Sequence, residues 1–276
     1  MSGSRPRAEF IDSARGRIFV LLRAPDRPGG RAVLIAPPFA EEMNKCRRLC
    51  TALAQALNHR GIAMVVPDLH GTGDSEGDFG EADWDCWTED LCAAADHSAR
   101  AGWPVAGLLG IRLGCQLAAD FSRRRTAPLE RTVYWQPVTD GARFLAQFLR
   151  LRVAARIMAA DRESVPRLRE RLAAEGSLDV AGYTLTAGLA REIDRRSVTD
   201  CLHANLGRLS VMEVLRSVPD AGATAVASQL LEHAAGVAIG TSHHRVAGEP
   251  FWSSTEIVDN PSLVELTAGQ FAALAS

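Results

Sequence analysis

The segment over residues 108–115, Leu-Leu-Gly-Ile-Arg-Leu-Gly-Cys, constrains the fold of this 276-residue chain more than any other. An apolar strand over residues 105–109 runs directly into Gly-x-Arg-x-Gly, and a helical pattern begins at Leu113. This is the layout of a nucleophile elbow, a tight strand-to-helix turn that needs small residues two positions on either side of its central residue. The central residue here is Arg112, which stays protonated and therefore cannot attack a carbonyl carbon.

Short apolar segments alternate with amphipathic helices along most of the chain. This pattern is typical of an α/β protein with a mostly parallel sheet covered by helices on both faces. Expected strands cover residues 17–22, 31–36, 62–66, 105–109, 131–136 and 209–215, with a strand-like end over 235–252. Expected helices cover residues 46–58, 83–101, 113–124, 221–234 and 261–274.

The pattern changes over residues 140–205. Helical spacing dominates there, for example between Phe144 and Phe148, and no convincing strand is visible. An inserted helical cap explains this change. We therefore expect a core over residues 1–139 and 206–276. The cap over residues 140–205 is expected to lie above the functional site at the elbow.

The composition argues against several classes of function. A net charge of −2 disfavours a nucleic-acid-binding protein, which would present a basic face. Arginines gather at 123–125 and along 143–171, but interleaved acidic residues in the second run favour a solvated helix face over a surface for an anionic partner. The six cysteines have no metal-ligand spacing, and we expect neither a metal nor a cofactor.

Targeting signals are also missing from the sequence. The first seven residues, Met-Ser-Gly-Ser-Arg-Pro-Arg, lack the apolar core of a signal peptide, and no run approaches the roughly 20 apolar residues of a membrane span. Cysteines in apolar helical contexts fit a reducing compartment. We expect a cytoplasmic protein with a small-molecule partner, no nucleic acid and no membrane span, and we leave a homodimer open.

Three segments resemble those of the α/β-hydrolase superfamily. Residues 36–45 follow a strand, where such proteins place the loop that supplies an oxyanion-hole amide. Residues 68–77, Asp-Leu-His-Gly-Thr-Gly-Asp-Ser-Glu-Gly, resemble the Asp-x-x-Gly-x-Gly-x-Ser turn of the superfamily, and the elbow is the third segment. The resemblance covers most of the chain apart from the cap and implies the α/β-hydrolase fold.

A narrower resemblance rests on five segments. They are Pro-Pro-Phe-Ala-Glu-Glu-Met-Asn-Lys at 37–45, Gly-Ile-Arg-Leu-Gly at 110–114, Trp-Gln-Pro at 135–137, Val-Ala-Gly-Tyr at 180–183 and Gly-Glu-Pro-Phe-Trp at 248–252. Together they resemble the second of the two hydrolases associated with the exosortase A system, in bacteria that make exopolysaccharide and sort PEP-CTERM proteins. The resemblance implies a hydrolase or acyl transferase and no particular substrate.

A catalytic serine triad is not recognisable in the sequence. The triad needs a nucleophile, an imidazole and an acid, and Arg112 removes the first. The segment after the last expected strand, residues 248–254, holds no histidine. His243 and His244 lie nearer the start of that strand and are expected at the wrong end of the sheet. Glu213 is either a candidate acid or an in-strand residue that faces a helix N-terminus.

Arg112 has two alternative roles. A guanidinium forms forked pairs with carboxylates and phosphates, and Glu41 and Glu42 lie on the neighbouring loop. If either glutamate pairs with Arg112, the ion pair is structural and blocks the position that a nucleophile would occupy. If neither does, the helix N-terminus and the arginine together favour an anionic ligand at the carboxyl ends of the strands.

Candidate site residues follow from these alternatives. His70 and Glu42 are the candidates for catalytic proton transfer. Substrate binding is assigned to residues of the elbow, the neighbouring loop and the strand after the elbow: Arg112, Glu41, Phe39, Leu113, Gln136 and Trp135.

Other reactive or aromatic side chains have simpler interpretations. Cys115 lies where a helix dipole lowers a thiol pKa, but a small buried cysteine is the favoured interpretation. Ser75 is expected to order its own turn, and Trp84 and Trp87 to lie in the core. Tyr183 could reach the site or simply pack the cap on the core.

Three hypotheses for function remain. The first is an enzyme of altered mechanism that acts on an ester or thioester. The second is a non-catalytic hydrolase fold that binds an anionic or acyl metabolite or a partner protein. The third, ordinary esterase chemistry, is disfavoured because Arg112 stands at the nucleophile position.

Overall fold

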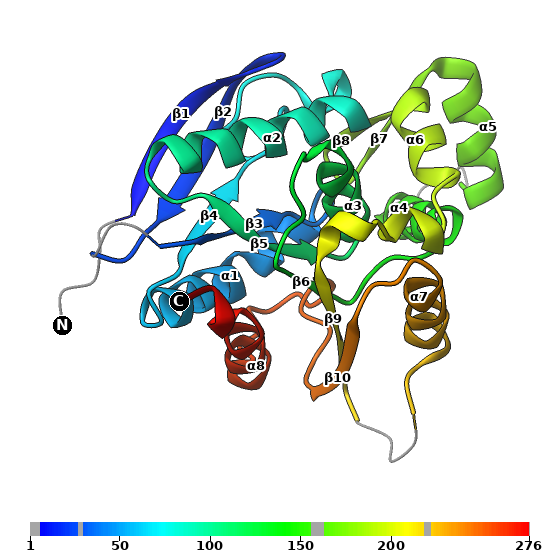
Figure 1. The fold of residues 1–276 in the computed structure, drawn as a ribbon. Coiled ribbons are helices and arrows are strands. Elements are labelled where there is room, and N and C mark those ends of the chain that lie inside the picture. Colours follow the sequence, from blue (N-terminus) through cyan, green and yellow to red (C-terminus); the bar gives the residue numbers. More distant parts are fainter. Residues whose placement is uncertain (1–5, 27–29, 156–162, 218–221, 276) are drawn as a thin grey trace.

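The computed structural model describes residues 6–26, 30–155, 163–217 and 222–275. Three of the predictions concern residues that lie partly outside these ranges. They are the N-terminal segment that lacks a signal-peptide core, the arginine-rich run at its residues 156–162, and the expected helix that starts at Ala221. Within the described ranges, the chain forms one large sheet, helices on both of its faces, and a group of helices with a small hairpin between β6 and β9 (Figure 1).

Eight strands form the large sheet, in the order β1-β2-β4-β3-β5-β6-β9-β10. The β1–β2 and β2–β4 pairs are antiparallel, whereas all pairs from β4 to β10 are parallel. The mostly parallel α/β sheet that the sequence predicts is therefore confirmed. The strands are β1 Arg7–Ser13, β2 Gly16–Arg23, β3 Ala32–Ala36, β4 Ala63–Pro67, β5 Val105–Ile111, β6 Arg131–Trp135, β9 Arg208–Leu215 and β10 Thr241–Ala247.

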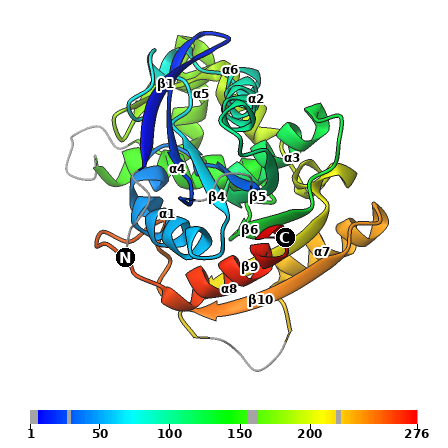
Figure 2. The ribbon, with the colours of Figure 1, turned by 60° about the vertical axis from the view of Figure 1, so that its left-hand side comes forward.

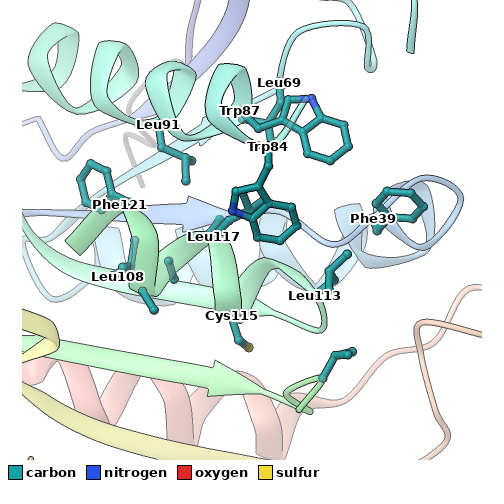
Figure 3. Close-up of a cluster of buried hydrophobic side chains, with 14 of the residues drawn as sticks. Phe39, Leu69, Trp84, Trp87, Leu91, Leu108, Leu113, Cys115, Leu117 and Phe121 are labelled. Carbon is teal, nitrogen blue, oxygen red and sulfur yellow. The ribbon is translucent and has the colours of Figure 1, made fainter. Parts of the chain in front are cut away.

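Helices cover both faces of this sheet (Figures 1 and 2). On one face α1 Glu42–Asn58 packs beside α8 Pro261–Phe271, and buried Leu53 and Phe271 join Leu109 of β5 in one core. On the other face lie α2 Trp84–Arg100 and α3 Gly114–Arg124. Figure 3 shows this second core, with Leu91 and Leu117 of these helices above the sheet. α7 Ala225–Gly236 follows β9.

The group between β6 and β9, which we call the cap, consists of α4 Gly141–Ala155, α5 Val165–Glu175, α6 Ala187–Asp194 and a two-stranded hairpin. The hairpin strands are β7 Ser177–Val180 and β8 Tyr183–Thr186. The expectation of no strand in this region is therefore wrong. Ala181 and Gly182 both have positive φ, as a two-residue turn of the primed type requires, and such short strands carry too few residues for a clear alternation.

Two differences at the start of elements bear on the site. α1 begins at Glu42, four residues before the predicted start at residue 46, so Glu42 lies in its first turn. The edge strand β1 was not predicted, because most of its residues are exposed and its sequence shows no apolar alternation. The Asp83 carboxylate caps α2 by accepting a hydrogen bond from the Cys86 amide.

Candidate functional site

The turn between β5 and α3 is built as an elbow. Arg112 has a φ of 57°, in the left-handed region that non-glycine residues rarely adopt. A Cβ on Gly114 would lie 2.3 Å from the Ala36 carbonyl oxygen, and a Cβ on Gly110 would lie 2.7 Å from the Cys115 Cα. The backbone packs so closely here that only glycine fits on either side of Arg112.

Three non-glycine residues with positive φ occupy the carboxyl ends of adjacent segments. They are Ala40 (φ 50°) before α1, Arg112 at the elbow and Gln136 (φ 46°) directly after β6. The Gln136 side chain fixes its own position, because Oε1 accepts a hydrogen bond from the Val214 amide at 2.8 Å. Strained residues of this kind cluster at functional sites, so their convergence marks this edge of the sheet.

The Arg112 side chain is held on three sides. Its Nε donates to Glu42 Oε1 at 3.2 Å, and its Nη1 donates to the Gln136 carbonyl at 3.3 Å. The guanidinium carbon lies 4.7 Å from the centre of the Trp252 ring, in a cation–π contact. Of the two alternatives from the sequence, the structure therefore contains the internal ion pair with Glu42, as a single contact rather than a fork.

Burial controls the electrostatics of this pair. The side chains of Arg112 and Glu42 are 12% and 9% exposed, and the loss of solvation raises the pKa of Glu42 to about 7 although Arg112 opposes the shift. Glu42 Oε2 has no hydrogen-bond partner among the described residues. Burial also raises the pKa of Glu41, whose Oε2 is equally unpartnered in the described part of the chain.

A pocket of about 300 Å³ opens beside Arg112. Its walls come from the segment after β6, from the cap helix α4 and from the β9–α7 region. This volume is at the lower end of the range for small-molecule sites. The polar residues that line it are Arg112, Gln136, Thr139, Asp140, Arg143, Gln147, Glu213 and Thr224.

Glu213 forms a hydrogen-bonded group at the pocket wall. Its Oε1 accepts from the Thr224 hydroxyl, and its Oε2 accepts from the Thr224 amide at 3.3 Å and contacts His243 Nε2 at 2.8 Å. Thr224 is the N-cap of α7, so the interpretation of Glu213 as a residue that faces a helix N-terminus is confirmed. The pairing with His243 was not predicted.

This group is not a catalytic triad. A triad needs the imidazole between the hydroxyl and the acid, whereas here the Glu213 carboxylate lies between Thr224 and His243. In the sheet, His243 pairs in register with Val211, two residues before Glu213. His243 therefore lies nearer the start of the strands than Glu213. Its imidazole nevertheless reaches Glu213 at the pocket wall, so the expectation that it lies at the wrong end of the sheet is not confirmed, although His243 is not among the residues that line the pocket.

His70 lies away from Arg112. The His70 ring packs against Gly77, its Nε2 lies 4.0 Å from Glu81 Oε2, and its backbone amide donates to Asp90. Neither Arg112 nor Glu42 is among these partners, so the structure does not bring the two candidates for proton transfer, His70 and Glu42, together.

Trp135 also differs from its expectation. It is fully buried, and its indole Nε1 donates to Thr267 of α8 at 2.9 Å. It therefore belongs to the core beneath the sheet and does not line the pocket. Adjacent strand residues point to opposite faces, and both faces of this sheet are buried, so an apolar pattern alone does not assign the face.

Phe39 and Leu113 do not line the pocket beside Arg112. They line an apolar cavity of only about 20 Å³, roughly the space for one water molecule. The Phe39 ring makes edge contacts with Phe79, Trp87, Phe144 and Phe148, at centroid distances of 5.0–5.9 Å. Figure 3 shows Phe39 and Leu113 at the same end of this cluster. Aromatic side chains fill the space.

The remaining candidates have structural roles. Cys115 is fully buried, and burial raises the pKa of its thiol well above the ordinary value, which overrides the helix dipole. The Ser75 hydroxyl donates to the Asp68 carbonyl and accepts from the Phe19 amide, so it orders its turn as expected. Trp84 and Trp87 are buried, as predicted. Tyr183 packs on Phe79 at 5.0 Å and joins the cap to the core.

Three of the segments that carry the narrower resemblance supply contacts to Arg112 of the second. Glu42 comes from the first segment, Gln136 from the third and Trp252 from the fifth, whereas the fourth forms the β7–β8 turn. Among the described residues, no group of three or more His, Cys, Asp and Glu residues could hold a metal ion. In the same ranges, no helix is long and apolar enough to cross a membrane.

Solved structures with the α/β-hydrolase fold match the whole chain. A putative hydrolase from Agrobacterium vitis S4 has a TM-score of 0.62 at 16% identity and covers 99% of each chain. Est1E from Butyrivibrio proteoclasticus, with ferulic acid bound, has a TM-score of 0.61 at 17% identity over 97% of this chain and 96% of its own. An α/β serine hydrolase homologue from Coxiella burnetii has a TM-score of 0.54 at 13% identity, over 95% and 96%.

These identities establish the fold and nothing narrower. No family model and no curated protein matches the chain. The protein has the α/β-hydrolase fold, and it resembles esterases and putative hydrolases at low identity.

Proposed function

We propose that this protein is a catalytically inactive member of the α/β-hydrolase superfamily that binds a small anionic metabolite in the pocket beside Arg112. The observation that carries the proposal is the position of the guanidinium. It replaces the nucleophile, it is held in place by Glu42, and it borders a pocket of ligand size. Est1E, which has the same fold, binds an organic acid, and this supports an acidic ligand here.

The site lacks the parts of a hydrolytic mechanism within the described residues. Arg112 supplies no nucleophile, and no imidazole lines the pocket in the ranges that the structure describes. The aromatic cluster around Phe39 fills most of the space on the side of the elbow that Phe39 and Leu113 line. A guanidinium with one remaining nitrogen, Nη2, that donates to no described residue instead suits charge-assisted hydrogen bonding to an anion.

A second candidate function is a hydrolase or acyl transferase of altered mechanism. Two observations favour it. The amide of Leu113 makes no hydrogen bond to another described residue, as in an oxyanion hole, and Glu42 has a pKa near 7, which suits a general base. Glu42 does not line the pocket beside Arg112, however, so we favour the binding function.

The biological setting is part of the same proposal. We place the protein among the exosortase A system-associated hydrolases on the strength of its sequence segments, and in the cytoplasm on the strength of its cysteines in apolar helical contexts. Residues 140–205 are then the cap, and the remainder is the core. The ligand would be a metabolite of exopolysaccharide production or of its acyl precursors.

Binding calorimetry tests the proposal directly. The probes are hexanoate and inorganic phosphate, titrated into the full chain. We expect at least one of them to bind, and Arg112→Gln and Arg143→Gln to weaken that binding by about tenfold or more, the effect of one charge-assisted hydrogen bond. Arg150→Gln, on the same helix as Arg143 but outside the pocket, is the matched control.

Two outcomes would contradict the binding function. The first is unchanged affinity in both Arg112→Gln and Arg143→Gln. The second is turnover of p-nitrophenyl butyrate by the wild type, or labelling of one of its serines by a fluorophosphonate, either of which would restore the enzymatic alternative.

A further inference from the structure

The pocket beside Arg112 has opposite charges on its walls. Arg112 and Arg143 supply two cations, whereas Glu213 and Asp140 supply two carboxylates. No ion pair joins Arg143 to another described residue, and its side chain comes from the exposed face of α4. The charges on the walls therefore balance, and they are distributed over separate elements of the fold.

Two side chains of opposite charge line the pocket from different elements. Arg112 comes from the elbow, and Glu213 comes from β9. The segment after β10 supplies no histidine and instead places Trp252 against the guanidinium. The pocket thus has a cation on one wall and an anion on another.

Glu213 retains capacity to bind a ligand. A carboxylate offers about four acceptor sites. Thr224 and His243 occupy three of them, one on Oε1 and two on Oε2. Glu213 is 2% exposed, so a donor that reaches the remaining site on Oε1 would be largely shielded from water and would interact strongly.

We infer that the ligand is zwitterionic, an amino acid or a related amino-carboxylate. Its carboxylate pairs with Arg112 and Arg143, and its ammonium group donates to Glu213. Gln147 and Thr139 also line the pocket, so their side chains supply hydrogen-bonding groups for the body of the ligand. This inference rests on the proposed function and narrows its ligand to one chemical class.

A simple monoanion fits the same walls less well. It would satisfy Arg112 and Arg143 but place an apolar or like-charged group against the buried carboxylate of Glu213, at a cost in desolvation. A ligand with both charges compensates both walls.

The larger groove between the cap and α2, of about 660 Å³, offers no comparable site. Its central charges are already satisfied by one another. Asp120 accepts from Trp84, Arg123 and Arg196, and Arg124 pairs with Asp85.

Matched ligand pairs test the inference on the unmodified protein. Each amino acid, such as 6-aminohexanoate, is compared with the acid that lacks only the amino group, such as hexanoate, by calorimetry at pH 7. The pairs span chain lengths of two to six carbons. For the length that fits, we expect the amino form to bind about tenfold tighter or more, the contribution of one charge-assisted hydrogen bond.

Glu213→Gln then assigns the effect to its residue. In this variant we expect the amino form to lose its advantage while the plain acid binds as before. Glu232→Gln, an exposed change on α7, is the control and should keep the advantage.

The outcomes distinguish a failure of the zwitterion inference from a failure of the proposed anion-binding function. Equal affinity for both members of every pair overturns the zwitterion and leaves anion binding at Arg112 intact. An amino-form advantage that persists in Glu213→Gln also overturns the inference, because the ammonium group is then recognised elsewhere. Binding of inorganic phosphate alone also overturns the zwitterion. Failure of every acid, every amino acid and inorganic phosphate to bind overturns the proposed function itself.

Discussion

At the scale of single residues, a permanent cation replaces a bond-forming atom. Arg112 occupies the strained central position of the elbow, and its guanidinium is paired, stacked and partly buried. The pair with Glu42 is a compromise, because burial disfavours the ionised carboxyl that the guanidinium favours. The proposed binding function therefore depends on charge and shape rather than on a nucleophile.

Restoring a hydroxyl should not restore esterase chemistry. In Arg112→Ser the new serine would have no imidazole beside it, because His243 is bound to Glu213 and does not line the pocket. We expect no increase in p-nitrophenyl acetate hydrolysis over the wild type in a stopped assay with purified protein. A rate gain of a hundredfold or more would mean that a usable base stands nearby, at odds with this account of the site.

Glu42 should make stability fall as pH rises. Its pKa is about 7 in the folded protein and near 4.5 in the unfolded chain, so between these values the folded state holds a proton that the unfolded state has lost. The free energy of unfolding then decreases from pH 5 to pH 8, by about 2–3 kcal/mol from this group. Urea unfolding of Glu42→Gln should show a correspondingly flatter slope against pH.

Exposed Glu232 provides the comparison for this measurement. The Glu232→Gln variant should follow the pH slope of the wild type. If Glu42→Gln follows that slope too, Glu42 ionises in the folded protein as it does in the unfolded chain, and burial does not raise its pKa.

At the scale of elements, the sequence predicted most of the sheet because its buried strands are short apolar runs between turn residues. The edge strand β1 and the β7–β8 hairpin have no such runs and were missed. The early start of α1 matters most for the site. Helical spacing was visible only from residue 46, yet the helix begins at Glu42 and its first turn presents that carboxylate to Arg112.

The candidate site was predictable where it depends on neighbouring strands. The order of parallel strands correctly placed Glu42 and Gln136 beside Arg112. It did not reveal the pair between Glu213 and His243, which depends on how far an imidazole reaches along the sheet. Nor did it assign Trp135 to the correct face, since both faces are apolar.

The elbow glycines should tolerate no side chain. A methyl group on Gly114 would approach the Ala36 and Pro37 carbonyl oxygens to 2.3 and 2.4 Å, so β3 or α3 must move. We expect Gly114→Ala to lower the free energy of unfolding by more than about 2 kcal/mol in urea melts. Gly269→Ala, which meets open space in α8, should be neutral or slightly stabilising. A Gly114→Ala protein as stable as Gly269→Ala would exclude the close backbone contact.

At the scale of the whole molecule, aromatic packing joins the cap to the core beside the elbow. Phe39 lies between rings of α2 and of the cap helix α4. The cavity that Phe39 lines is only about 20 Å³, whereas the pocket beside Arg112 and Glu213 is about 300 Å³.

Removing the Phe39 ring should loosen the cap. Phe39→Ala is expected to lower the free energy of unfolding by about 3–5 kcal/mol and to expose α4–α6 to limited proteolysis. Phe10→Ala, which removes a half-exposed ring on the edge strand, should change neither property appreciably. Cleavage outside the cap, or none at all, would show that the cluster does not hold the cap in place.

A crystal structure of the protein soaked with an amino-carboxylate of fitting length, such as 6-aminohexanoate, tests the central claim most directly. The account predicts a carboxylate within hydrogen-bond distance of Arg112, in the pocket between the elbow and Glu213, and no covalent adduct at the elbow. Density for the ligand only on the Phe39 side of the elbow, with the guanidinium turned away from the Glu213 pocket, would contradict it.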